Sequence, residues 1–189
     1  MNKGLNKAVT IISKIGEVGA WIGAGFSAVG VGMAAMSKID SLSYISSVNS
    51  EPEASVNGFS IGLLDASGHP ITSAYVILFV TLLIMCILTA MICRNINLIF
   101  KTAAGKTKFS QGETPFQPDV IRMVKEIGYF LIAMPVVGII MQIICGILSH
   151  GMIEVSVEFN SIFTGLVVLA LSQYFAYGME LQNEVDGLV

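Results

Sequence analysis

The chain has 189 residues, of which 54% are hydrophobic and only 12% are charged, and its mean hydropathy is +0.77. Soluble domains carry about 25% charged residues, so a water-soluble globule of this composition could not cover its own surface. The net charge of −3 excludes a basic nucleic-acid-binding protein on bulk grounds. We therefore expect an integral membrane protein that forms a single domain over residues 1–189.

Four apolar stretches are long enough, or nearly long enough, to cross a lipid bilayer as helices. A crossing helix needs about 20 predominantly apolar residues, and none of these stretches contains Asp, Glu, Lys or Arg. Their continuous apolarity also differs from the alternating pattern of a membrane β-barrel. We predict an all-α fold with spans over about residues 18–36, 71–93, 127–148 and 162–178, external loops 37–70 and 149–161, and an inner loop 94–126. The short last span would lengthen by beginning at Phe159 or by continuing through Met179.

The basic residues predict the orientation, because loops on the cytoplasmic side of a membrane carry an excess of Lys and Arg. Of the ten basic residues, only Lys38 lies in an external loop. The others precede the first span or lie between the second and third spans: Lys3, Lys7, Lys14, Arg94, Lys101, Lys106, Lys108, Arg122 and Lys125. Both termini are therefore expected in the cytoplasm, with acidic loops outside.

The two external loops contain period-two patterns that are typical of strands. Residues 59–63 alternate between apolar and small side chains, and residues 66–68 supply a turn signal. Residues 153–159 alternate between apolar and polar side chains. We expect these segments to pair into a small extracytoplasmic β cap. The alternative is that they form independent extended loops.

An internal repeat relates the first span to the third. Residues 12–22 align without a gap with residues 121–131, and both segments carry Glu, a β-branched residue and Gly in succession. Pro118 and Asp119 mark a helix start ahead of the second copy, because proline suits an early helix position and Asp favours the positive helix end. Since both segments enter the membrane from the same side, the repeat predicts two parallel helical hairpins.

The first span is rich in small residues, and Gly19, Gly23 and Ser27 recur every fourth position. Such a row lets helix backbones approach closely in lipid, where burial of apolar surface gives no driving force. One interpretation is packing within a single chain. The other is a homodimer interface or a contact with a partner helix.

The third span carries Pro135, Gly138 and Gln142 along one stripe. Pro135 frees a backbone carbonyl, and the Gln142 amide needs a hydrogen-bond partner at membrane depth. The candidate partners are Thr81, Thr89, Ser172 and Gln173. The stripe is either a structural contact between helices or a midplane solute site. No span contains the ionisable groups that ion-coupled transporters usually place in the membrane.

His69 and His150 lie at the outer ends of the second and third spans, and Glu154 follows in the second external loop. In one interpretation these residues form a pH-sensitive or metal-binding cluster. In the other they are separate, solvated side chains, since no spaced ligand motif accompanies them.

The sequence contains no phosphate-binding glycine loop, zinc-protease motif or nucleophile elbow. Cys86, Cys93 and Cys145 all lie within spans, which favours a role as small packing residues. We therefore expect no catalytic residue, no cofactor and no resident metal ion, and we expect that the protein is not an enzyme.

The C-terminal segment carries Glu180 and Glu184 on one helix face. We expect these two carboxylates and that of Asp186 to form ion pairs with Lys101, Arg122 or Lys125 of the inner loop, each pair being weak if exposed. Alternatively, the acidic segment docks a cytoplasmic protein.

Three short motifs lie ahead of the third span, at its entry and near the C-terminus. They read Gly112-x-x-Pro115-Phe116, Ile127-Gly128, and Phe175-x-x-Gly178-x-x-Leu181-x-x-Glu184-x-Asp186. Together with the four-span plan over nearly the whole chain, they resemble the YoaS-like bacterial membrane proteins, a family defined by a domain of unknown function. Asn183 and the ending Gly187-Leu188-Val189 depart from the last motif. The resemblance implies a multi-pass protein of the bacterial cytoplasmic (inner) membrane, whose gene often neighbours a helix-turn-helix regulator, and it implies no activity.

The leading hypothesis is a non-enzymatic regulatory, sensory or protective accessory protein that acts through contacts with a membrane or cytoplasmic protein. The lipid bilayer is its other expected partner, and nucleic acid is not expected. The alternative is a small-solute transporter or channel, built from one chain or from a homodimer, with its site around Pro135, Gly138 and Gln142.

Overall fold

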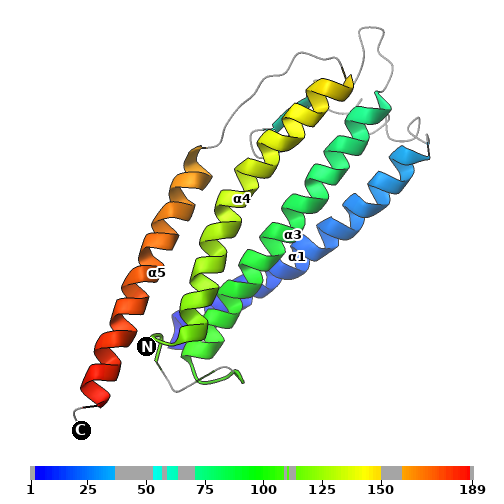
Figure 1. Cartoon of the computed structure of the whole chain (residues 1–189). Coiled ribbons are helices and arrows are strands. Elements are labelled where there is room, and N and C mark those ends of the chain that lie inside the picture. The colour runs from blue at the N-terminus through cyan, green and yellow to red at the C-terminus, as the bar shows by residue number, and fades with distance from the viewer. Residues whose placement is uncertain are drawn as a thin grey trace. The chain divides into compact units, whose positions relative to one another are not determined.

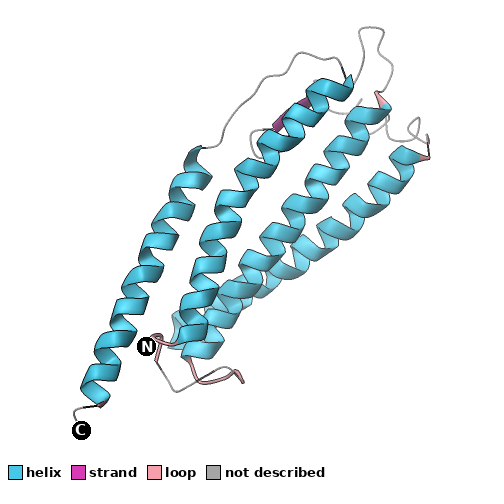
Figure 2. Ribbon diagram, in the orientation of Figure 1, coloured by secondary structure: helices cyan, strands magenta, loops and turns pink. Residues whose placement is uncertain are grey.

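The computed structural model describes residues 3–36, 53–56, 59–63, 71–108, 110, 114–149 and 159–187. These residues form helices and one two-stranded sheet (Figures 1 and 2). The elements are α1 (Lys3–Ala35), β1 (Glu53–Val56), β2 (Phe59–Gly62), α3 (Thr72–Ala103), α4 (Pro118–Ser149) and α5 (Phe159–Asp186).

Four helices in the described part of the chain are long and apolar enough to cross a membrane, as the hydropathy pattern predicts. The qualifying segments are Gly4–Ala35, Thr72–Ala103, Pro118–Leu148 and Phe159–Val185. Each helix extends beyond its predicted span. The fourth begins at Phe159, so the span that looked short in the sequence belongs to a helix of ample length.

The inner loop is shorter than the sequence suggested, because α3 continues past Cys93 to Ala103 and α4 begins at Pro118. The α4 start confirms the prediction from Pro118 and Asp119. The α3 end has a glycine cap: Gly105 has a φ of 70°, its N–H donates to the Thr102 carbonyl, and the Lys106 N–H donates to the Lys101 carbonyl. This is the double hydrogen bond of a Schellman motif, which favours glycine at the left-handed position.

The chain divides into two compact units. The terminal unit comprises Met1–Ala20, Leu88–Ile132 and Asn160–Val189, and so contains both chain ends. The hairpin unit comprises Trp21–Ile87 and Ala133–Phe159, and contains the two strands.

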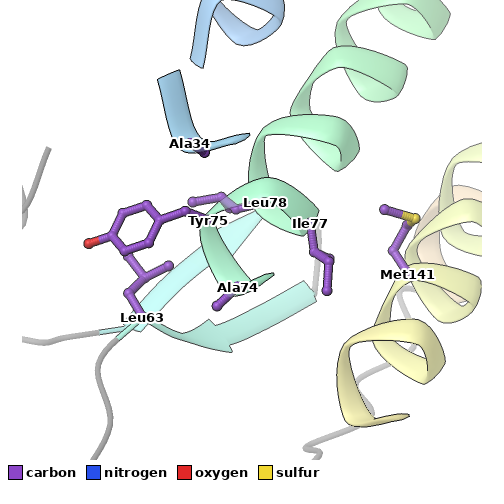
Figure 3. Close-up of a cluster of buried hydrophobic side chains, with 7 residues drawn as sticks. All are labelled: Ala34, Leu63, Ala74, Tyr75, Ile77, Leu78 and Met141. Carbon is purple, nitrogen blue, oxygen red and sulfur yellow. The ribbon is translucent and has the colours of Figure 1, made fainter. Parts of the chain in front are cut away.

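The hairpin unit has a small apolar core where α1, α3 and α4 meet the strand segment (Figure 3). The Ile71 N–H donates to the Leu63 carbonyl over 2.9 Å, which ties the residue after β2 to the start of α3. Figure 3 shows Leu63 beside the Tyr75 ring. The buried side chains of this core are Ala34, Leu63, Ala74, Tyr75, Ile77, Leu78 and Met141.

The two strands pair with each other in antiparallel register, with Val56 opposite Phe59 and Glu53 opposite Gly62. The alternating segment 59–63 therefore does contain a strand. Its partner is the segment just before it, Glu53–Val56. The proposed second partner over residues 153–158 lies outside the described residues. Phe159, the last residue of that pattern, is the first residue of α5 rather than part of a strand.

Glycines at every seventh position of α1 bring this helix close to α3. A Cβ added at Gly16 would lie 3.0 Å from Cys93 Sγ in the terminal unit. In the hairpin unit, Gly23 makes the same 3.0 Å approach to Cys86 Sγ, and a Cβ at Gly30 would lie 2.5 Å from the Phe79 ring. Because the α3 partners follow in reversed chain order, α1 and α3 are antiparallel within the hairpin unit.

Candidate functional site

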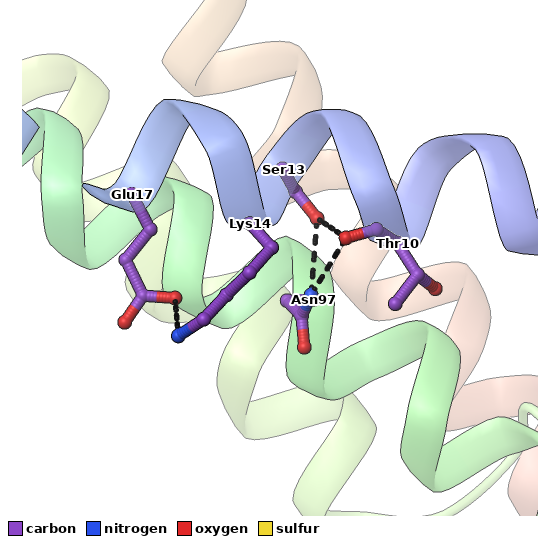
Figure 4. Close-up of polar contacts among 5 residues, drawn as sticks. All are labelled: Thr10, Ser13, Lys14, Glu17 and Asn97. Atoms are coloured by element: carbon purple, nitrogen blue, oxygen red, sulfur yellow. Dashed lines mark hydrogen bonds and ion pairs between the residues drawn. The ribbon is translucent and has the colours of Figure 1, made fainter. Parts of the chain in front are cut away.

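Two asparagines of α3 connect this helix to both of its neighbours in the terminal unit. Asn97 Nδ2 donates to the Thr10 carbonyl of α1 over 2.9 Å and to Ser13 Oγ over 3.4 Å (Figure 4). Asn95 Nδ2 donates to Glu126 Oε2 of α4 over 2.9 Å. Both asparagines are 4% exposed. Buried amides that are hydrogen-bonded in this way fix the register of the helices, because a shift along the axis would leave polar groups unpaired.

Charged side chains also lie in the terminal unit, close in sequence to the residues that the two asparagines contact. Lys14 Nζ is 2.9 Å from Glu17 Oε2 on α1 (Figure 4). On α4, Arg122 lies 3.4 Å from Asp119 and 3.6 Å from Glu126. The Lys14 and Arg122 side chains are more than half exposed, so each pair contributes little stability on its own.

The segment between α3 and α4 is fixed by hydrogen bonds of its own. The hydroxyls of the buried Thr102 and of Thr107 are 2.9 Å apart, and Ser110 Oγ donates to the Thr102 carbonyl over 3.0 Å. Gln117 is almost fully buried, and its Nε2 donates to the Thr114 carbonyl over 2.7 Å. These bonds hold the described part of the connection as ordered local structure just before α4.

This connection also contacts α5, through a contact that we call the loop–α5 dock. The Phe116 and Phe175 ring centroids are 6.0 Å apart at an interplanar angle of 48°. A Cβ added at Gly178 would lie 2.6 Å from the Phe116 ring, so the ring occupies the space that any other residue would fill. Thr114 Oγ1 accepts the Phe116 N–H and donates to Gln182 Oε1 over 3.0 Å. The dock therefore consists of Thr114, Phe116, Phe175, Gly178 and Gln182.

A second glycine contact joins α4 to α5. A Cβ added at Gly128 would lie 3.1 Å from the Gly165 carbonyl oxygen and 2.7 Å from Leu169. A Cβ added at Gly165 would lie 3.0 Å from the Gly128 carbonyl oxygen. The two backbones thus approach each other directly, as small residues permit.

The residues predicted as a helix interface on α1 separate into two environments. Gly23 faces Cys86, and the buried Ser27 donates to the Gly23 carbonyl over 2.9 Å, so both lie on the side of α1 that packs within the chain. Gly19 is exposed, and a Cβ added there would meet no described atom within 4 Å. Gly128, which aligns with Gly19 in the internal repeat, is tightly packed against α5. The two copies of the repeat therefore make different helix contacts.

The midplane candidates lie together on a buried face of α4 in the hairpin unit. Pro135 and Gly138 are buried, and Gln142 is 2% exposed. A Cβ added at Gly138 would meet no described atom within 4 Å despite this burial. Thr81 and Ser172, two of the candidate partners of Gln142, donate to backbone carbonyls of their own helices, at Ile77 and Leu169.

His69, His150 and Glu154 lie outside the described residues. Within the residues that the structure describes, no group of three or more His, Cys, Asp or Glu side chains could hold a metal ion.

In the described part of the chain, the predicted ion pairs of Glu180 and Glu184 with the inner loop are not formed, and the side chain of Asp186, the third acid of that prediction, lies outside the described residues. Among the described residues, the ion pairs are the α1 pair and the two Arg122 pairs on α4, and none involves Glu180 or Glu184. The cause is register. Thr114 donates a hydrogen bond to Gln182, so the acidic part of α5 lies beside the connection before α4 and not beside Arg122 or Lys125.

Sequence reasoning did not identify Asn95, Asn97 or Gln117 as structural residues. The sequence does contain a pattern that points to the asparagines. Both follow closely on the apolar run of the second span, and their amides need hydrogen-bond partners if the helix continues through them. The role of Phe116 had a weaker signal, namely its place in one of the three motifs described above. That this motif meets the C-terminal one required the structure.

Comparison of the chain with protein-family models, with curated proteins and with solved structures gives no match.

Proposed function

We propose that the protein is a multi-pass protein of the bacterial cytoplasmic membrane that acts as a non-enzymatic accessory protein through contacts made at its terminal unit. The membrane assignment is supported by the four long apolar helices and by the large apolar side chains exposed on α1 and α5, such as Phe26 and Phe163. Exposed apolar side chains of this size need lipid or another protein to cover them.

The proposed orientation places both termini and the connection between α3 and α4 in the cytoplasm. The support is the distribution of Lys and Arg, which flank the inner ends of α1, α3 and α4. In this orientation the β1–β2 hairpin belongs to an external cap. The bacterial location and the YoaS-like family are proposed on the motifs quoted above.

The loop–α5 dock is the observation that carries the proposed function. A connection of this length needs no fixed structure to join two helices, yet its described part is held by internal hydrogen bonds at Thr102 and Gln117. It contacts α5 through the Phe116 ring and through Thr114. Phe116 remains partly exposed, and Glu180 and Glu184 are exposed next to Gly178 and Gln182. An ordered polar surface with an accessible aromatic anchor is suited to protein recognition.

The test compares the proteins retained by the tagged chain after gentle extraction from its own membranes. We expect a partner to be retained equally by the wild type and by Phe26→Ala, a control of the same chemistry at an exposed α1 position. We expect at least a fivefold loss of that partner with Phe116→Ala, at unchanged helical content. Equal retention by both variants, or no protein above an untagged control, would contradict the proposal.

Small-solute transport is the second candidate, and the environment of Gly138 favours it. Gly138 is buried next to unfilled space, one turn from the buried Gln142 amide. If a solute binds there, a Gln142→Leu variant that stays folded should lose uptake into vesicles and lose any small molecule that the wild type retains. Unchanged uptake would remove this site.

A further inference from the structure

Contacts in the terminal unit bring the inner ends of three predicted spans to one level. Gly16, just before the first span, packs on Cys93, the last residue of the second span. Asn95 of α3 donates a hydrogen bond to Glu126, which directly precedes the third span. At a rise of about 1.5 Å per residue, the three inner ends coincide to within about 5 Å. In the proposed orientation this level is the inner boundary of the apolar layer of the membrane.

The fourth predicted span does not end at this level. A Cβ added at Gly165 would lie 3.0 Å from the Gly128 carbonyl oxygen, so Gly165 lies beside the inner boundary. The loop–α5 dock continues the same antiparallel alignment, because the Phe116 ring lies against Gly178. Gly178, which ends the fourth predicted span, therefore lies about 20 Å from this boundary on the cytoplasmic side. We call this position of α5 the docked register.

The sequence of α5 fits a complete crossing instead. Residues 159–178 contain no Asp, Glu, Lys or Arg, and they lie between Glu158 and Glu180. As a helix this stretch is about 29 Å long, which matches an apolar layer of about 30 Å. It would fill that layer if Gly178 were level with Gly128. We call this second position of α5 the spanning register.

The docked register is costly in a membrane at both ends of the apolar stretch. Leu166, Leu171 and Tyr174 are 53%, 47% and 73% exposed, and in this register they lie on the cytoplasmic side of the boundary. At the other end, Phe159 lies only about 9 Å inside the apolar layer. The residue before it in the sequence is Glu158, and a charged side chain is costly at that depth. Movement of α5 outward by about 20 Å removes both costs.

The docked register is held by specific contacts, although α5 is only lightly packed. The Phe116 ring fills the space beside Gly178, and Thr114 donates a hydrogen bond to Gln182. Only 11% of the most apolar stretch of α5 is buried inside the chain, compared with 22–28% for the other three long helices. Specific contacts thus favour one position of α5, and coverage by lipid favours another. Such a balance is the basis of a two-state element.

We propose that α5 moves along α4 between the docked and spanning registers, and that the loop–α5 dock stabilises the docked one. This inference rests on the membrane orientation and on the function proposed above. Because Phe116 and Gly178 are together only in the docked register, the position of α5 determines whether the surface offered to a partner protein exists. A partner that binds this surface favours the docked register in return, since a ligand stabilises the state that it binds.

The accessibility of one cysteine on α5 measures the register. Cys86, Cys93 and Cys145 are first replaced by alanine, and Ala170→Cys is introduced at an exposed position of α5. Residue 170 lies about 8 Å outside the inner boundary in the docked register and about 12 Å inside the apolar layer in the spanning register. A membrane-impermeant maleimide, added to inside-out vesicles, should therefore label it only in the docked register.

Substitutions in the dock should change this labelling. Gly178→Leu leaves no room for the Phe116 ring and should lower the labelling of residue 170 at least fivefold. Phe116→Ala removes the same contact from the other side and should act in the same direction. Asn183→Leu, at an exposed position of α5, is the matched control and should leave labelling unchanged. Glu184→Cys, used as the reporter in place of residue 170, is cytoplasmic in both registers and should be labelled equally in every variant.

Crosslinking tests whether the docked register exists in the membrane. Thr114 and Gln182 are hydrogen-bonded over 3.0 Å. In a chain without other cysteines, Thr114→Cys and Gln182→Cys should therefore be joined by a short bismaleimide. Gly178→Leu should lower the yield at least fivefold. The pair of Thr114→Cys with Gln173→Cys, about 14 Å farther along α5, should be joined poorly.

The possible outcomes separate this inference from the proposed function. Labelling of residue 170 that is the same with and without the dock would overturn the movement of α5, and so would the absence of the Thr114–Gln182 crosslink in membranes. Neither result bears on whether Phe116 retains a partner protein. If labelling and crosslinking change as expected while Phe116→Ala retains every partner, the movement stands and the proposed function is contradicted.

Discussion

At the scale of single residues, two glycines of α4 show how local space decides the effect of one added methyl group. Gly128 faces the Gly165 backbone and Leu169, and Gly138 faces open space. Both lie in a helix interior, where glycine costs about 0.5–1 kcal/mol relative to alanine. The same substitution therefore has opposite expected signs at the two positions.

Gly128→Ala should lower the stability of the protein by about 1–3 kcal/mol, because the added methyl would lie 2.7 Å from Leu169 and 3.1 Å from the Gly165 carbonyl oxygen, so the side chain would have to move next to a backbone that cannot rotate away. Gly138→Ala should be neutral or should raise stability by up to about 1 kcal/mol, through reduced backbone entropy of the unfolded chain. Thermal unfolding of both variants in the same detergent, followed by circular dichroism, measures the difference. A Gly128→Ala variant as stable as Gly138→Ala would contradict the close approach of α4 and α5.

At the scale of elements, the loop–α5 dock determines how firmly the end of α5 is held. Beyond Gly178 the described contact of α5 with the connection before α4 is the Thr114–Gln182 hydrogen bond. The Phe116 ring against Gly178 therefore supplies most of the apolar contact at this end. Loss of the ring contact should free this end of the helix.

Gly178→Leu should expel Phe116 and increase amide hydrogen exchange of residues 179–185 roughly tenfold, which corresponds to about 1.4 kcal/mol of lost local stability. Asn183→Leu adds the same side chain to an exposed position of the same helix and should leave exchange unchanged. Equal exchange in the two variants would show that Phe116 does not hold this end of α5.

Elements specified by local pattern were predictable from the sequence, and contacts between distant segments were not. Continuous apolarity predicted the helices, and Pro118 with Asp119 predicted the start of α4, because both signals act within one or two turns. The contact of Phe116 with Gly178 joins residues far apart in the chain, and no periodicity reports it. The predicted ion pairs of Glu180 and Glu184 with Lys101, Arg122 or Lys125 failed for the same reason, since contacts at Gly128 and Thr114, far from these acids in the chain, determine the register of α5.

At the scale of the whole molecule, composition predicted the class of protein, and the exposed surface indicates how the protein works. The chain has too few charged residues for a water-soluble surface, and its described helices leave large apolar side chains uncovered on α1 and α5. In the proposed membrane orientation lipid covers these side chains, and the loop–α5 dock is the proposed contact for a partner protein.

Native mass spectrometry of the tagged protein, released from its own membranes in a mild detergent, tests this account most directly. The account predicts the 20.1 kDa chain together with a second protein at fixed stoichiometry. Phe116→Ala should remove the second protein. A single chain that carries no other protein and retains a small molecule would contradict the account and would favour transport.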